Sequence, residues 1–142
     1  GRDNARTPMQ WDSSPQAGFT TGTPWLPVNP NYTEINAENR LADPTSVFYT
    51  YAALIRLRKQ YEVFVKGDFT LLEKDHPHLF VYQRHYQHEN LLVVCNFGGT
   101  ATEWSLPPYW HGATCLVQNY QDTPVNGLRP WEARIYFKNE VN

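Results

Sequence analysis

The chain has 142 residues, which is the size of one ordinary domain or of a small domain with an appendage. Its 12 basic and 14 acidic side chains leave a formal net charge of −2, so nothing in the charge balance indicates a nucleic-acid partner. Hydrophobic residues make up 41% of the chain, which is enough for a packed core, and no apolar run approaches the ~18 residues of a membrane span. We therefore expect a folded chain with no nucleic acid bound and no membrane segment.

Residues 1–42 follow neither a helical nor a strand period. They contain five prolines, yet they also contain large apolar side chains, among them Met9, Trp11, Phe19, Trp25, Leu26 and Tyr32. Disordered segments rarely carry so many such groups, and a structureless run of ~40 residues is unusual in a compact domain. We interpret this segment as a long ordered loop that packs against a partner, which need not belong to this chain.

Residues 43–61 have the pattern of a helix. Asp43 is a good N-cap residue and Pro44 fits the first helical position. Apolar side chains recur at helical spacing from Val47 to Ile55, and basic residues in the last turns suit the helix dipole.

Short segments with strand character occupy most of residues 62–142. The candidate strands are 68–73, 79–86, 90–96, 102–106, 113–118 and 131–137. Their close spacing, with no helix between them, predicts antiparallel pairing and a small β-sandwich of about seven strands.

No convincing catalytic set is evident in these residues. The carboxylates are scattered through loops, and the histidine pairs 76/78 and 85/88 fall in turns rather than at the spacing of a zinc site, so we predict no metal. Cys95 and Cys115 lie in apolar runs, which favours free thiols of raised pKa over the alternative of a structural disulfide. The tryptophans at 104, 110 and 131 could stack on sugar rings, although such residues more often fill a core.

The most specific stretch is residues 1–12, which read GRDNARTPMQWD. It closely resembles a loop of the oligo-1,6-glucosidase branch of glycoside hydrolase family 13. The resemblance continues through AGFT (17–20), PWLPVNPNY (24–32), IN (35–36), SVFY (46–49), LIRLRK (54–59) and LLVVCNF (91–97). It therefore covers nearly the whole chain.

The resemblance implies a fold that is mainly β. In that family a (β/α)8 barrel of ~250 residues precedes an antiparallel β-sandwich called domain C. Residues 1–62 would be the end of the barrel, namely the loop after its eighth strand and its last helix, and residues 63–142 would be domain C. The chain starts at Gly1 and its one methionine is Met9, so we expect a piece of a longer protein.

The same resemblance assigns substrate binding to two arginines. Loops that follow barrel strands face the active site, and Arg2 would contact the terminal glucose while Arg6 would lie near the acid/base or the next sugar. Asp3 and Asn4 would fix the loop. The alternative is that all four residues only hold the loop together. The catalytic carboxylates of the family would lie before Gly1, so no catalytic residue and no cofactor is assigned here.

The expected parent is a retaining α-glucosidase acting on short α-1,6-linked glucosides such as isomaltose, and we expect a small oligosaccharide substrate to bind through the missing barrel. A trehalose-6-phosphate hydrolase is the alternative within the family, and a carbohydrate-binding or purely structural β-domain is the alternative of another class. We expect the 142 residues alone to be inactive and to self-associate through exposed apolar surface, and by resemblance we expect a cytoplasmic location.

Overall fold

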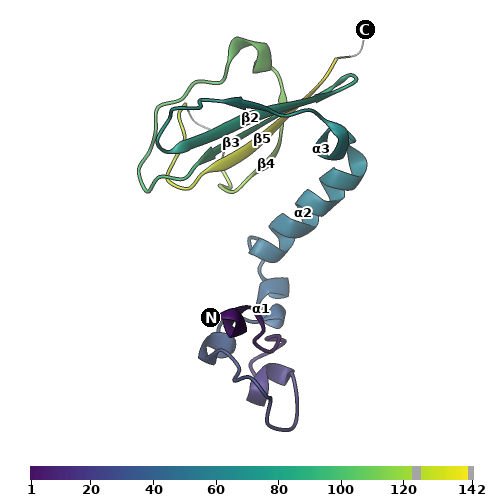
Figure 1. Cartoon of the computed structure of the whole chain (residues 1–142), viewed down its shortest axis with the longest axis vertical. Coiled ribbons are helices and arrows are strands. Elements are labelled where there is room, and N and C mark those ends of the chain that lie inside the picture. The colour runs from purple at the N-terminus through teal and green to yellow at the C-terminus, as the bar shows by residue number, and fades with distance from the viewer. Residues whose placement is uncertain (123–125, 141–142) are drawn as a thin grey trace. The chain divides into compact units, whose positions relative to one another are not determined.

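The computed structural model describes residues 1–122 and 126–140 (Figure 1). The chain divides into two compact units, Gly1–Ala52 and Ala53–Asn142, which we call the loop unit and the β unit. The helix α2 (Val47–Gln60) begins in the first unit and ends in the second. Within the described ranges, no helix is both long enough and apolar enough to cross a membrane.

The loop unit is built from short turns rather than from long elements. Three 3-10 turns, η1 (Arg2–Ala5), η2 (Pro15–Gly18) and η3 (Pro30–Thr33), precede the short helix α1 (Ala37–Ala42). The helix α1 was not predicted, although its N-cap Asn36 is a typical one: the side chain accepts a hydrogen bond from the Asn39 amide at 2.8 Å.

The predicted start of the long helix is wrong by four residues. Asp43 has an extended conformation at the end of α1, and its carboxylate accepts hydrogen bonds from the amide and hydroxyl of Thr45. Asp43 therefore closes a turn between the two helices, and α2 begins at Val47. A capping side chain and the following proline fit a turn as well as a helix start, which explains the error.

The β unit contains a single antiparallel sheet of five strands in the part of the chain that the structure describes. The strands are β1 (Thr70–Leu72), β2 (Leu79–Tyr86), β3 (Glu89–Asn96), β4 (Thr114–Gln118) and β5 (Ala133–Asn139). Their order is β1-β2-β3-β5-β4, so β3 is the central strand (Figure 1). The predicted antiparallel, mainly β architecture is confirmed.

Two apolar clusters cover the two faces of this sheet. On one face Val81, Leu92, Val94 and Tyr136 pack against Trp110 and Leu128 from the connections between strands. On the other face Leu91 and Val93 pack against Val63 of the short helix α3 (Val63–Lys66). The alternation of buried side chains along β2, β3 and β5 thus supplies both layers of the core.

Three of the predicted strands are altered. The segment 68–73 is shortened to β1 (Thr70–Leu72). Residues 102–106 form one isolated bridge, Thr102 to Leu128, because Trp104 and Leu106 pack on the core and the prolines at 107 and 108 lack the amide needed to extend a ladder. The last strand begins at Ala133 rather than at Trp131, since Trp131 has a positive φ of 57° that interrupts an extended strand.

Candidate functional site

The first turn of the loop unit carries the residues that the sequence analysis assigned to substrate binding. Arg2, Asp3 and Asn4 all lie within η1, and Arg6 follows it directly. The Arg6 amide donates to the Asp3 carbonyl at 2.9 Å, and Arg6 Nη1 lies 3.4 Å from Asp3 Oδ1. Asp3 therefore holds Arg6 through both its backbone and its side chain.

The guanidinium of Arg6 has a second neighbour. Its central carbon lies 5.4 Å from the ring centroid of Trp25, which is within the range of a cation–π interaction. The structure thus brings Asp3, Arg6 and Trp25 together, and it leaves Arg2 exposed and without an ion pair among the described residues. In the sequence, Trp25 stands out only as an apolar residue within the stretch PWLPVNPNY. The prolines at 24 and 27 that flank it were the available signal for a rigid segment.

A hydrogen-bonded frame supports this turn from behind. The amides of Trp11 and Asp12 both donate to the Ala17 carbonyl, and the amides of Ala37 and Glu38 donate to the carbonyls of residues 10 and 11. These bonds tie the segment after η1 to the start of α1. The loop is therefore ordered by backbone pairing, since the buried residues of the described loop unit, Pro8, Ala17, Asn36 and Ser46, are small or polar.

The tightest point of this frame is the turn from Asp12 to Gly18. Hydrogen bonds from the hydroxyl and amide of Ser14 hold the Asp12 carboxylate and lower its pKa. Gly18 has a φ of 65°, and a Cβ at this position would lie 2.5 Å from Asp12 Oδ2. Glycine is required here for both reasons.

The chemistry available in this turn is recognition rather than catalysis. A guanidinium presents fixed N–H donors that suit sugar hydroxyls and carboxylates. Within the described residues, no group of three or more His, Cys, Asp or Glu side chains is arranged to hold a metal ion. The site can orient a polyhydroxylated ligand, and the bond-breaking groups would have to come from elsewhere.

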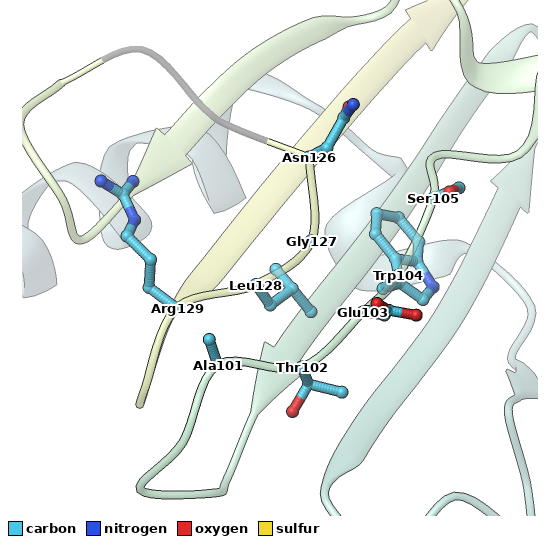
Figure 2. Close-up of a pocket in the computed structure, with 9 residues that line it drawn as sticks. All are labelled: Ala101, Thr102, Glu103, Trp104, Ser105, Asn126, Gly127, Leu128 and Arg129. Carbon is cyan, nitrogen blue, oxygen red and sulfur yellow. The ribbon is translucent and has the colours of Figure 1, made fainter.

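The β unit carries a hollow with a volume of about 460 Å³ (Figure 2). Its lining includes Glu103, Trp104, Asn126 and Arg129, which lie beside the bridge between Thr102 and Leu128. Trp104 also packs against the apolar core. Of the tryptophans considered for sugar stacking, Trp110 is a core residue with 3% exposure.

Arg129 at the edge of this hollow belongs to a network of charges around Glu132. The Glu132 carboxylate is fully buried and accepts hydrogen bonds from Arg129 and Arg134, while Arg129 also pairs with Asp122. Burial alone would raise the pKa of Glu132, but the hydrogen bonds from the two guanidinium groups outweigh it and lower the pKa to about 2. This network fixes the turn before β5.

The two cysteines are half-buried free thiols, as predicted. Burial raises the pKa of both Cys95 and Cys115, which disfavours the thiolate and therefore nucleophilic chemistry.

Comparison with known proteins identifies the family to which this chain belongs. Residues 1–67 match the family model described as alpha amylase, catalytic domain, and residues 69–133 match the model described as maltogenic amylase, C-terminal domain. The chain belongs to glycoside hydrolase family 13, the α-amylase family. The turn that carries Arg2 and Arg6 therefore lies in the part that matches the catalytic domain, and strands β1 to β4 and the hollow of Figure 2 lie in the part that matches the C-terminal domain.

Three family relatives illustrate the extent of the match. The chain is 51% identical to the oligo-1,6-glucosidase of Halalkalibacterium halodurans, over 99% of this chain and 26% of that protein. It is 44% identical to the trehalose-6-phosphate hydrolase of Bacillus subtilis, over 95% of this chain and 25% of that protein. The crystal structure of the Bacillus licheniformis trehalose-6-phosphate hydrolase superimposes with a TM-score of 0.90 at 42% identity, over 99% of this chain and 27% of that one. The chain spans about a quarter of the length of these relatives.

Proposed function

We propose that these residues work as the C-terminal part of a retaining, exo-acting α-glucosidase that hydrolyses short α-1,6-linked glucosides such as isomaltose. The observation that carries the proposal is the 51% identity to an oligo-1,6-glucosidase over 99% of the chain. Retention requires one carboxylate as nucleophile and a second as acid and then base. On this proposal those groups belong to the remainder of the catalytic domain.

In the proposed enzyme the turn η1 contributes to the sugar site. Arg2 contacts the terminal glucose, where its guanidinium, which has no ion pair among the described residues, can bind hydroxyls and a carboxylate from another loop. Arg6 lies farther along the site, toward the leaving sugar, and the exposed 3.4 Å ion pair with Asp3 restrains it weakly. Asn4 helps to fix the turn, in which its amide donates to the Gly1 carbonyl.

The rest of the chain has a structural role in this proposal. The boundary lies near residue 62, with domain C after it. The loop unit and α2 expose large apolar side chains, among them Met9, Trp11, Phe19, Ile35, Val47 and Tyr51. Each forgoes ~1.5–3 kcal/mol of burial if it stays in water. We propose that the remainder of the barrel covers them, and that the isolated 142 residues are inactive and self-associate instead.

The test is hydrolysis by the whole protein, which we expect to be cytoplasmic, with isomaltose, maltose and trehalose 6-phosphate as substrates. Isomaltose should give the highest kcat/KM, and NMR should detect α-glucose as the first product. Arg2→Ala should lower kcat/KM by about 10- to 100-fold, the usual value of a charged hydrogen bond. Lys74→Ala, an exposed cation of the β unit, is the control and should behave as wild type. Inversion at the anomeric carbon would refute the mechanism.

A trehalose-6-phosphate hydrolase is the second candidate, favoured by the TM-score of 0.90 with the Bacillus licheniformis enzyme of that name. In that case trehalose 6-phosphate should be preferred to isomaltose in the same assay. A carbohydrate-binding domain is the candidate of another class, and it predicts millimolar or tighter binding of maltose or isomaltose by the 142 residues alone, measurable by calorimetry.

A further inference from the structure

Trp25 is a large apolar side chain in a solvent-exposed position. Its ring is 84% exposed, more than any other large apolar side chain among the described residues. Pro24 precedes it and Pro27 follows after Leu26, so the backbone of this segment has few conformations to lose. The chain thus presents a large ring on a stiff support.

The guanidinium of Arg6 lies over this ring. Its central carbon is 5.4 Å from the Trp25 centroid, while Asp3 Oδ1 contacts the same guanidinium at 3.4 Å. Exposed ion pairs restrain long side chains weakly, because both partners stay hydrated and mobile. A ring face from a distant segment adds a restraint from a second direction, and a guanidinium can use that face while its N–H donors remain free for a ligand.

We propose that Trp25 is a positioning residue that holds Arg6 for the sugar on the leaving-group side of the scissile bond. The inference rests on the proposed function, since it takes the Arg6 turn to border the sugar site. Trp25 itself need not touch the substrate. Its ring face selects the Arg6 conformer that contacts the substrate. The effect of Trp25 is therefore confined to substrates that carry a leaving sugar.

Two substrates separate this role from a packing role. The disaccharide is whichever of isomaltose, maltose and trehalose 6-phosphate the whole wild-type protein hydrolyses fastest, and it carries a leaving sugar. α-D-Glucosyl fluoride transfers the same glucosyl group but has only fluoride to leave. We expect Trp25→Leu to lower kcat/KM for the disaccharide about two- to five-fold, the size of an exposed cation–π contact, and to leave kcat/KM for the fluoride unchanged.

Three further variants complete the experiment. Trp25→Phe keeps a ring face and should restore most of the disaccharide activity. Arg6→Ala combined with Trp25→Leu should lose no more than Arg6→Ala alone, because the ring has nothing left to hold. Trp131→Leu removes a tryptophan of the β unit that is 62% exposed, and it should leave kcat/KM unchanged for both substrates.

Three results would contradict the proposed role of Trp25. Equal losses on both substrates, no loss on either, or losses that add in the double variant would overturn the positioning role. A wild-type preference for trehalose 6-phosphate over isomaltose would refute the proposed substrate and leave the comparison between disaccharide and fluoride intact. The two proposals therefore fail on different measurements.

Discussion

The two units of this chain are held together in different ways. In the β unit, side chains such as Leu91, Leu92 and Val94 are at most 1% exposed and lie in a five-stranded sheet with a core on each face. In the loop unit the buried residues of the described chain are small or polar, namely Pro8, Ala17, Asn36 and Ser46, and its large apolar side chains face outward. The β unit has the apolar core of an independent domain, whereas the loop unit is a hydrogen-bonded frame whose apolar surface suits a partner.

The largest effect should come from the core of the β unit. Leu92 is fully buried in the central strand, so Leu92→Ala should cost about 3–4 kcal/mol of unfolding free energy through lost burial and a cavity. Phe97→Ala removes a larger side chain that is 62% exposed, and it should cost under about 1 kcal/mol. Urea denaturation of the 142 residues gives both values. Equal losses of unfolding free energy would mean that burial in the core does not determine the stability of the β unit.

The buried charge of the β unit should give the next largest effect. Glu132→Gln leaves Arg129 and Arg134 without their shared carboxylate and should cost about 3 kcal/mol. Asp122→Asn breaks only the exposed end of the network, since the Asp122 side chain is 67% exposed, and should cost under about 1 kcal/mol.

The same carboxylate predicts an acid dependence. Its folded-state pKa of about 2 lies below the ordinary value of 4.5, so the folded protein binds this proton less readily than the unfolded chain. The stabilisation is therefore complete above pH 4.5 and is lost as the pH falls from 4.5 toward 2. The melting temperature of wild type should decline across this window more steeply than that of Glu132→Gln. If the melting temperatures of the two proteins declined in parallel, the acid dependence could not be assigned to Glu132.

In the loop unit the expected effects are smaller and local. Gly18→Ala forces a side chain into a positive φ and against the Asp12 carboxylate, which should cost about 1–2 kcal/mol. Hydrogen exchange at the Trp11 amide, which bonds to Ala17, should accelerate while the β unit keeps its protection. At Gly22 an added Cβ meets only the Thr20 hydroxyl at 3.8 Å, so Gly22→Ala is the control and should leave exchange unchanged.

The strands were the part of the fold most accessible from the sequence. The expected segment 79–86 matches β2 residue for residue, and 90–96 matches β3 but for one residue, because the buried apolar run of β3 and the turn residues that separate the two strands leave few alternatives. The boundaries that failed depend on tertiary contacts. Trp104 packs on the core instead of extending a ladder, and the burial of Glu132 between two arginines has no local signature in the stretch RPWEAR.

The candidate site was accessible only in part. Arg2, Asp3, Asn4 and Arg6 stand in a distinctive stretch, so sequence alone could nominate them, and the structure places them in and directly after one turn. The contribution of Trp25 depends on a contact between two loop segments far apart in sequence, which no periodicity encodes. Their roles toward a sugar remain predictions for the kinetic experiments above.

The smallest predicted effect tests the contrast between the units most directly. Asn36 is 3% exposed, and its side chain accepts from the Asn39 amide and donates to the Tyr32 carbonyl, both at 2.8 Å. Its neighbour Ile35 is larger and apolar but 52% exposed. In the 142 residues alone, Asn36→Ala should weaken α1 by about 1 kcal/mol and speed exchange of the Asn39 amide about five-fold, while Ile35→Ala should leave it unchanged. If Ile35→Ala had the greater effect, the loop unit would be held by apolar contacts, and hydrogen bonds could no longer explain its order.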